Sequence, residues 1–171
     1  TSQQRADQAI AEGRFSRSLI TVTNPDGSVA LDHEEFPRPE TTLESLSGLK
    51  TVFDVARDVP VEASGTTYGQ LIQRKYPDLE NFNHIHHAGN SSGVVDGAAA
   101  LLLASEDYIQ RTGLKPRARV VATANQGDCP TLMLNAPVPA ARKVLAKAGL
   151  DIADIDLWEI NEAFAVVAEK F

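Results

Sequence analysis

Apolar residues recur every three or four positions in several stretches of the chain, and this spacing predicts amphipathic helices. The predicted helices cover residues 2–12, 41–50, 68–76 and 139–148, and a last helix begins at Asn161. Local signals fix some of their ends. Thr41 and Glu44 have the spacing of a capping box, Pro139 opens a helix, and Gly149 ends it.

Other stretches have the alternating or β-branched character of strands. Two short strands, 19–23 and 28–32, flank the turn sequence NPDG, which predicts a hairpin. The runs 118–124 and 157–160, together with a short stretch at 84–87, predict three more strands. The order strand, helix, strand, helix at the end of the chain predicts a parallel βαβ unit under layered helices.

The most apolar run, 94–104, follows a turn of small residues, GNSSG, at 89–93. Asp96 is its only polar side chain, so we predict a helix buried on all sides and extended by residues 108–113. It is too short to cross a membrane, which takes about 20 apolar residues. The turn fits two interpretations. Its N–H groups and hydroxyls bind a phosphate, carboxylate or amide-bearing ligand, or it simply leads the chain into a core helix.

Charge and cysteine content narrow the range of functions. The net charge of -7 and a pI near 5.0 argue against general nucleic-acid binding, which depends on clustered Lys and Arg. Cys129 is the only cysteine, which excludes an intramolecular disulfide and a cysteine-based zinc site. We see no signal peptide or membrane span, and we expect a cytoplasmic location, or an organellar matrix in a eukaryote. The chain opens on Thr1 and stops at Phe171 within an apolar pattern, so we expect a piece of a longer protein.

Two motifs occur together, GNSSGVVDGAAALLLAS and, one strand–helix–strand unit later, DIDLWEINEAFAVVAEKF. With ARVVATA and PVPAARKVLAKAGL between them, and with SQQRADQAIAEGRF and FPRPETTLESLSGLKTVF before them, the chain resembles the thiolase family of acyl-CoA acyltransferases. The resemblance implies an α/β fold of five layers, αβαβα. By this resemblance, residues 1–82 are the later part of a CoA-covering loop domain, 83–115 close the first half of the fold, and 116–171 open the second.

The resemblance also implies an activity, which is the CoA-dependent cleavage of a 3-ketoacyl-CoA or the reverse Claisen condensation. In the family a cysteine nucleophile, a second cysteine and a histidine do this chemistry, and their segments have no match in this chain. Cys129, in GDCPT, resembles neither catalytic cysteine segment, and its simplest interpretation is a small incidental residue. We therefore expect the isolated chain to be inactive. We expect acyl-CoA as substrate, no covalently bound cofactor, no metal, and a homodimer or homotetramer for the complete protein.

The site residues follow from the same resemblance. Asn161 of NEAF resembles the asparagine that orients a water in the oxyanion hole, although an asparagine here also suits an ordinary helix cap. Arg38 resembles an arginine near the CoA adenine, a role that suits its charge and its capacity to stack. The other positions expected along the CoA and acyl channel are Ser45, Phe53, Ala88, Ser92, Gly93, Ala163 and Phe164.

The chain departs from the family pattern between residues 53 and 88, where a longer polar connection ends in His84-Ile85-His86-His87 in place of small or β-branched residues. Paired histidines on one strand face leave open a metal-dependent hydrolase that uses His84, His86 and Asp96. A second alternative is a module that binds CoA without catalysis. The simplest interpretation of the histidines is capping or packing beneath the loop.

Overall fold

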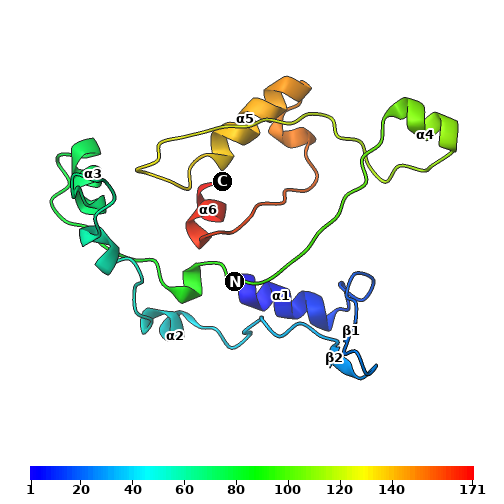
Figure 1. The fold of residues 1–171 in the computed structure, drawn as a ribbon, viewed down its shortest axis with the longest axis horizontal. Coiled ribbons are helices and arrows are strands. Elements are labelled where there is room, and N and C mark those ends of the chain that lie inside the picture. Colours follow the sequence, from blue (N-terminus) through cyan, green and yellow to red (C-terminus); the bar gives the residue numbers. More distant parts are fainter. The chain divides into compact units, whose positions relative to one another are not determined.

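The computed structural model describes residues 1–171, which form two compact units, Thr1–Leu49 and Lys50–Phe171. We describe each unit separately. The first unit contains α1 (Ser2–Ala11), β1 (Val22–Thr23), β2 (Val29–Leu31) and α2 (Leu43–Ser47) (Figure 1). The second contains η1 (Val55–Asp58), α3 (Tyr68–Lys75), η2 (Ala88–Asn90), α4 (Glu106–Thr112), α5 (Pro137–Ala148), η3 (Ile152–Asp154) and α6 (Ala165–Lys170).

The hairpin of the first unit is confirmed, although its strands are shorter than expected. β1 and β2 pair antiparallel, with a register shift between Val22 and Thr23. The turn closes because the Gly27 N–H donates to the Asn24 carbonyl at 2.9 Å, with Gly27 at a φ of 85° that suits glycine. The Ser28 N–H and hydroxyl donate to Asp26, and these bonds lower the pKa of that carboxyl.

Capping boxes start two helices. The helix predicted at 41–50 is α2, and its cap is Thr42 with Ser45, not Thr41 with Glu44. Thr41 instead donates its hydroxyl to the Arg38 carbonyl at 2.7 Å, so it closes the preceding turn. The helix predicted at 68–76 is confirmed as α3, which begins after Thr67.

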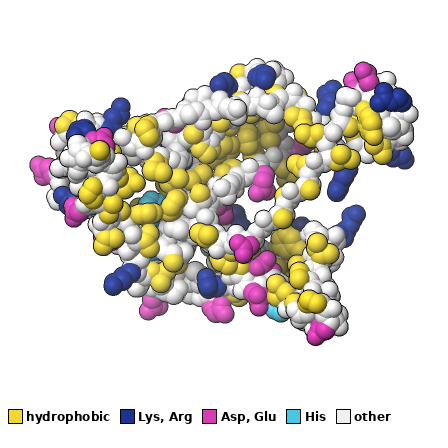
Figure 2. Space-filling model, viewed as in Figure 1, with side chains coloured by type: hydrophobic (Ala, Val, Ile, Leu, Met, Phe, Trp, Pro, Cys, Tyr) yellow, Lys and Arg dark blue, Asp and Glu magenta, His cyan; other side chains and the backbone are white.

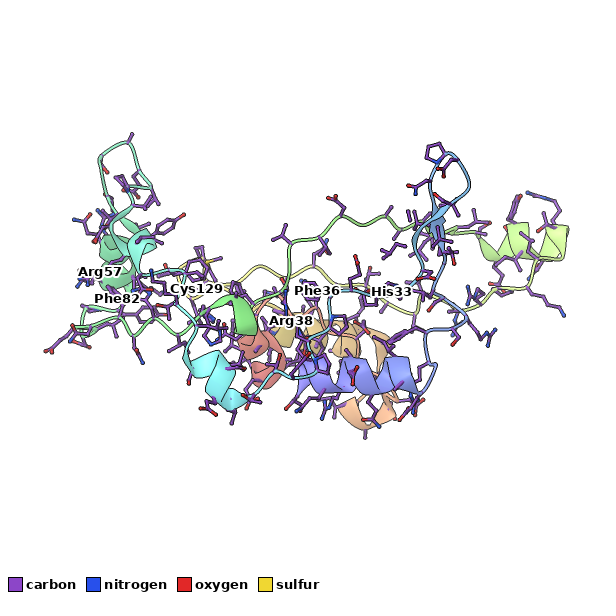
Figure 3. The ribbon with its side chains drawn as sticks, turned by 90° about the horizontal axis from the view of Figure 1, so that it is seen from below. His33, Phe36, Arg38, Arg57, Phe82 and Cys129 are labelled. Atoms are coloured by element: carbon purple, nitrogen blue, oxygen red, sulfur yellow. The ribbon has the colours of Figure 1, made fainter.

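A small packed region surrounds the start of α3. Thr66 is only 6% exposed, and its hydroxyl accepts a hydrogen bond from Arg74 at 3.2 Å. Gly69 is buried and packs against Arg57. A Cβ atom added to Gly69 would lie only 2.9 Å from the Arg57 Cγ, so the contact leaves no room for a side chain. The Arg57 guanidinium in turn lies 5.0 Å from the centre of the Phe82 ring (Figure 3). The long connection after residue 53 therefore has its own local structure.

Glycines in the left-handed conformation end α4 and α5, as the sequence indicates. Gly113 has a φ of 69° and Gly149 a φ of 68°. α5 begins at Pro137, two residues earlier than the expected start at Pro139. Along α5, Lys143 donates to the Asn125 carbonyl at 2.8 Å, and Lys147 donates to the Thr123 carbonyl at 3.2 Å. These bonds hold the segment around residue 124 beside the helix.

The predicted buried helix at 94–104 is wrong. This segment runs as coil into α4 (Figure 1), and its side chains are open, with Val94 at 103% and Leu101 at 90% exposure. A continuous apolar run has no period that separates a buried helix from a strand buried on both faces. Only residues 106–112 of the expected extension are helical, capped by Ser105.

The strands predicted at 84–87, 118–124 and 157–160 are also absent, and the only sheet is the β1–β2 hairpin. The expectation of a parallel βαβ unit is therefore wrong for these residues. A strand exists only through hydrogen bonds to a neighbour, and these apolar segments do not pair with one another. The last helix begins at Ala165 and not at Asn161, because Phe164 is extended and pairs with Ser91.

Few side chains are fully enclosed. Val167 of α6, at 4% exposure, is the one buried large hydrophobic residue. Hydrophobic side chains are visible at many places on the face drawn in Figure 2. No helix of the structure has both the length and the apolar character needed to span a membrane. The division at residues 82 and 115 stays a prediction.

The cap of α3 can be tested by replacing Thr67 with alanine. The Gln70 N–H donates to the Thr67 hydroxyl at 3.3 Å, and the Gln70 side chain accepts from the Thr67 N–H at 3.0 Å. Loss of such a cap costs about 1 kcal/mol, so we expect roughly fivefold faster hydrogen exchange of the α3 amides. Thr67→Ser keeps the hydroxyl and should exchange like the wild type. Equal exchange in all three proteins would show that the box does not stabilise α3.

Candidate functional site

The turn at 87–92 is closed by its own hydrogen bonds. The His87 N–H donates to the Asn90 side chain at 2.8 Å, and the Gly89 N–H donates to His87 Nδ1 at 3.1 Å. Asn90 also donates its amide to the Ile85 carbonyl at 2.8 Å, and the Ser91 hydroxyl donates to the His87 carbonyl at 2.9 Å. Asn90 and His87 thus act as internal clamps. The Gly89 N–H, which the ligand-binding interpretation of the turn counted as a free donor, is therefore occupied by His87.

The same turn lies directly against the NEAF segment. Ser91 and Phe164 form an antiparallel bridge, and the Ser92 N–H donates to the Ala163 carbonyl at 3.0 Å. Two motifs about seventy residues apart therefore meet through backbone contacts. Asn161 lies two residues before Ala163, at the same junction in the chain, and its side chain is exposed. An exposed amide at this position is free of the helix-capping role, since α6 starts four residues later.

Three aromatic side chains gather beside this junction. The centre of the His86 ring lies 4.8 Å from that of Phe164 and 6.1 Å from that of Phe53, and the two phenyl rings are 6.0 Å apart. These distances are typical of favourable aromatic pairs. The backbone supports the cluster, because the Val52 N–H donates to the His86 carbonyl at 2.9 Å, next to a bridge between Thr51 and His87.

The structure thus brings together four of the expected channel residues: Phe53, Ser92, Ala163 and Phe164. Ala88 is the first residue of η2 in the turn itself, and Gly93 follows the turn as exposed coil. The segments that meet are 51–53, 86–92 and 163–164. We call this meeting point the turn–NEAF junction.

Arg38 and Ser45 belong to the first unit and have local partners there. The Arg38 guanidinium lies 5.6 Å from the centre of the Phe36 ring, and its backbone N–H donates to Gln3 at 2.7 Å (Figure 3). The Ser45 hydroxyl accepts from the Thr42 N–H at 3.0 Å, so part of its hydrogen-bonding capacity is used in the cap of α2. Arg38 keeps a charged and exposed head, as an adenine or phosphate contact requires.

Sequence reasoning considered His86 only as a metal ligand of the hydrolase alternative and did not place it among the residues of the CoA and acyl channel. The structure places His86 in the aromatic cluster, and it places His84 against Phe82, with ring centres 6.4 Å apart. No three potential metal ligands come together, so His84, His86 and Asp96 do not form the metal site that the hydrolase alternative needs. The signal that identifies His86 is its pairing with Phe164, which depends on tertiary contacts.

Cys129 lies away from these residues in sequence, in a tight turn (Figure 3). The backbone N–H groups of Leu132 and Thr131 donate toward its sulfur and lower the pKa of the thiol, with a smaller effect from Lys75. Four and five residues after Cys129 the chain takes positive φ values, 56° at Met133 and 57° at Leu134, which are uncommon outside glycine. No sequence pattern predicted this thiol environment, because it arises from backbone geometry.

Comparisons with known proteins are consistent with these motifs. The family models "Thiolase, N-terminal domain" and "Thiolase, C-terminal domain" match residues 1–67 and 114–170. The chain is 44% identical over 170 residues to the 3-oxoadipyl-CoA/3-oxo-5,6-dehydrosuberyl-CoA thiolase of Escherichia coli K12, covering 98% of this chain and 36% of that protein. It is 41% identical over 167 residues to a 3-ketoacyl-CoA thiolase of Aeromonas hydrophila, and this match covers 96% of this chain and 36% of that protein.

Solved structures show the same relationship. The acetyl-CoA acetyltransferase of Bacillus anthracis superimposes with a TM-score of 0.71 at 33% identity, over 99% of this chain and 36% of that one. The dimeric peroxisomal thiolase of Saccharomyces cerevisiae gives a TM-score of 0.70 at 33% identity, over 98% of this chain and 35% of that one. The chain therefore spans about 36% of the length of the relatives that it matches.

The environment of Cys129 predicts a shifted alkylation profile. The thiolate is the reactive form, and a lowered pKa makes it available at lower pH. We expect the iodoacetamide reaction rate of Cys129 in the folded protein to reach half its maximum at a lower pH than in the protein unfolded in urea. The unfolded protein is the control, since unfolding removes the N–H donors of Thr131 and Leu132. Coincident profiles would contradict this account of the turn.

Proposed function

Because this chain belongs to the thiolase family, we propose that the complete protein is an acyl-CoA C-acyltransferase that cleaves a 3-ketoacyl-CoA with CoA or runs the reverse condensation. The observation that carries the proposal is the turn–NEAF junction, in which Ser92 donates to Ala163 and Ser91 pairs with Phe164. The names of the similar proteins, which act on 3-oxoadipyl-CoA or 3-ketoacyl-CoA, support the same reaction class.

In this proposal the junction forms one wall of the thioester site. Thiolytic cleavage breaks the bond between the second and third carbons of the ketoacyl group, transfers the acyl part to sulfur, and protonates the departing carbon. Negative charge builds on the thioester oxygen, and hydrogen-bond donors placed in advance lower that barrier. Asn161, an exposed amide beside the junction, supplies such a donor through a water. The nucleophilic cysteine is expected outside residues 1–171.

The remaining residues have binding roles in the proposal. Phe53, Ala163 and Phe164 give an apolar surface for the pantetheine and acyl parts of the substrate, next to the turn of Ala88, Ser92 and Gly93. Arg38 contacts the adenine end of CoA by charge and stacking, and Ser45 contributes a hydroxyl nearby. Acyl-CoA is a substrate here, with no bound cofactor or metal. We also propose a homodimer or homotetramer in the cytoplasm or an organellar matrix.

A second candidate is a module that binds CoA without catalysis. It describes residues 1–171 taken by themselves, because their single cysteine, Cys129 in GDCPT, matches neither catalytic segment. The two candidates differ in turnover. The acyltransferase consumes acetoacetyl-CoA in a CoA-dependent reaction when the complete protein is assayed, whereas the module only binds CoA. Binding without turnover by a complete protein would reject the acyltransferase.

Replacement of Asn161 with alanine tests its proposed role. Loss of one oxyanion donor costs about 10²-fold in turnover, so we expect kcat for acetoacetyl-CoA cleavage by the complete enzyme to fall by about that factor. Asn83→Ala removes an exposed amide that lies outside the segments forming the junction and serves as the control. If kcat of Asn161→Ala equals that of the wild type, the oxyanion assignment is rejected.

Replacement of Arg38 with alanine tests the adenine contact. Because this contact is remote from the reacting atoms, we expect KM for CoA substrates to rise with kcat nearly unchanged. Arg57→Ala is the matched control, since Arg57 also lies over an aromatic ring, that of Phe82. A defect confined to kcat, or an equal rise of KM in the control, would contradict the assignment.

A further inference from the structure

His86 packs against two rings, those of Phe53 and Phe164, that the proposed function places along the thioester channel. Its ring centre is 4.8 Å from that of Phe164, at an interplanar angle of 56°, and 6.1 Å from that of Phe53, at 83°. Phe164 belongs to the NEAF segment, one residue after the carbonyl that accepts from Ser92. The imidazole therefore contacts the channel residues from the side.

The backbone on both sides of this cluster is fixed. On one side, the Val52 N–H donates to the His86 carbonyl at 2.9 Å, and Thr51 bridges to His87. On the other side, Phe164 is held by its bridge to Ser91. With the backbones of all three rings tied, the position of the Phe164 ring depends on the volume of the side chain that it packs against.

The ring acts here by its shape. His86 Nδ1 is enclosed and has no hydrogen-bond partner in the structure, so this nitrogen neither clamps the turn nor holds a carboxylate. His87 provides the contrast, because its Nδ1 accepts from the Gly89 N–H. A side chain whose buried nitrogen is unpartnered contributes through packing against Phe53 and Phe164.

We propose that His86 is a positioning residue that sets the acyl-chain selectivity of the enzyme by holding the Phe164 ring against the turn–NEAF junction. This inference rests on the proposed acyltransferase function. A smaller side chain at this position leaves room for Phe164 to turn away, which widens the acyl end of the site. We therefore expect kcat/KM to rise for 3-ketoacyl thioesters with longer acyl chains relative to those with short ones.

The test compares two substrates in the complete enzyme, acetoacetyl-CoA and 3-oxodecanoyl-CoA, each with CoA. For His86→Val we expect the ratio of kcat/KM, long over short, to rise by about tenfold, the size of effect that a few methylenes have in a hydrophobic pocket. His86→Phe keeps the ring and lacks the nitrogens, so its ratio should stay within about twofold of the wild type. A ratio is insensitive to partial unfolding, because loss of active enzyme lowers both values equally.

His84→Val is the matched control, since His84 packs near Phe82 and not near Phe164. The inference is overturned if His86→Val keeps the wild-type ratio, or if His84→Val changes the ratio as much. It is also overturned if His86→Phe behaves like His86→Val, because the nitrogens would then be needed. A wild-type enzyme that turns over neither thioester would reject the proposed function instead, which is a distinct outcome.

Discussion

The contact on which the site depends is a backbone hydrogen bond, from the Ser92 N–H to the Ala163 carbonyl, beside the bridge of Ser91 to Phe164. These groups belong to every residue, so the contact is made by the path of the chain and not by a particular side chain. It fixes where the NEAF segment lies against the turn. Because Phe164 pairs with Ser91 in extended conformation, α6 starts only at Ala165, which leaves Asn161 outside the helix.

The turn contributes through rigidity. His87 and Asn90 consume the donors and acceptors at its start, so its shape is set without help from a ligand. A turn closed in this way presents small residues, Ala88, Ser92 and Gly93, to whatever lies against it. Pre-formed geometry of this kind lowers the cost of binding, because less conformational freedom is lost when a substrate arrives.

The long connection after residue 53 adds a second kind of constraint. Its η1–α3 region packs on its own through buried Thr66 and through Gly69 against Arg57. The same connection begins at Phe53 and ends at His86, which meet at the aromatic cluster. This connection therefore returns the chain to the junction with the imidazole of His86 at its end.

The sequence alone predicted the features that short-range physics controls. The glycine stops at Gly113 and Gly149 and the hairpin turn depend on residues a few positions apart. The predicted capping box of α2 was placed one residue too early, at Thr41 in place of Thr42, and the cap of α3 was not predicted. The paired motifs were also sufficient to place the chain in its family. Tertiary structure decided the rest. The apolar runs at 94–104, 118–124 and 157–160 form a helix or a strand only when a neighbour supplies backbone pairing and a buried surface. Here none of them pairs in a sheet, and their large hydrophobic side chains are mostly exposed. His86 likewise acquired its position from Phe53 and Phe164, residues that are distant in sequence, and no local pattern encodes such a contact.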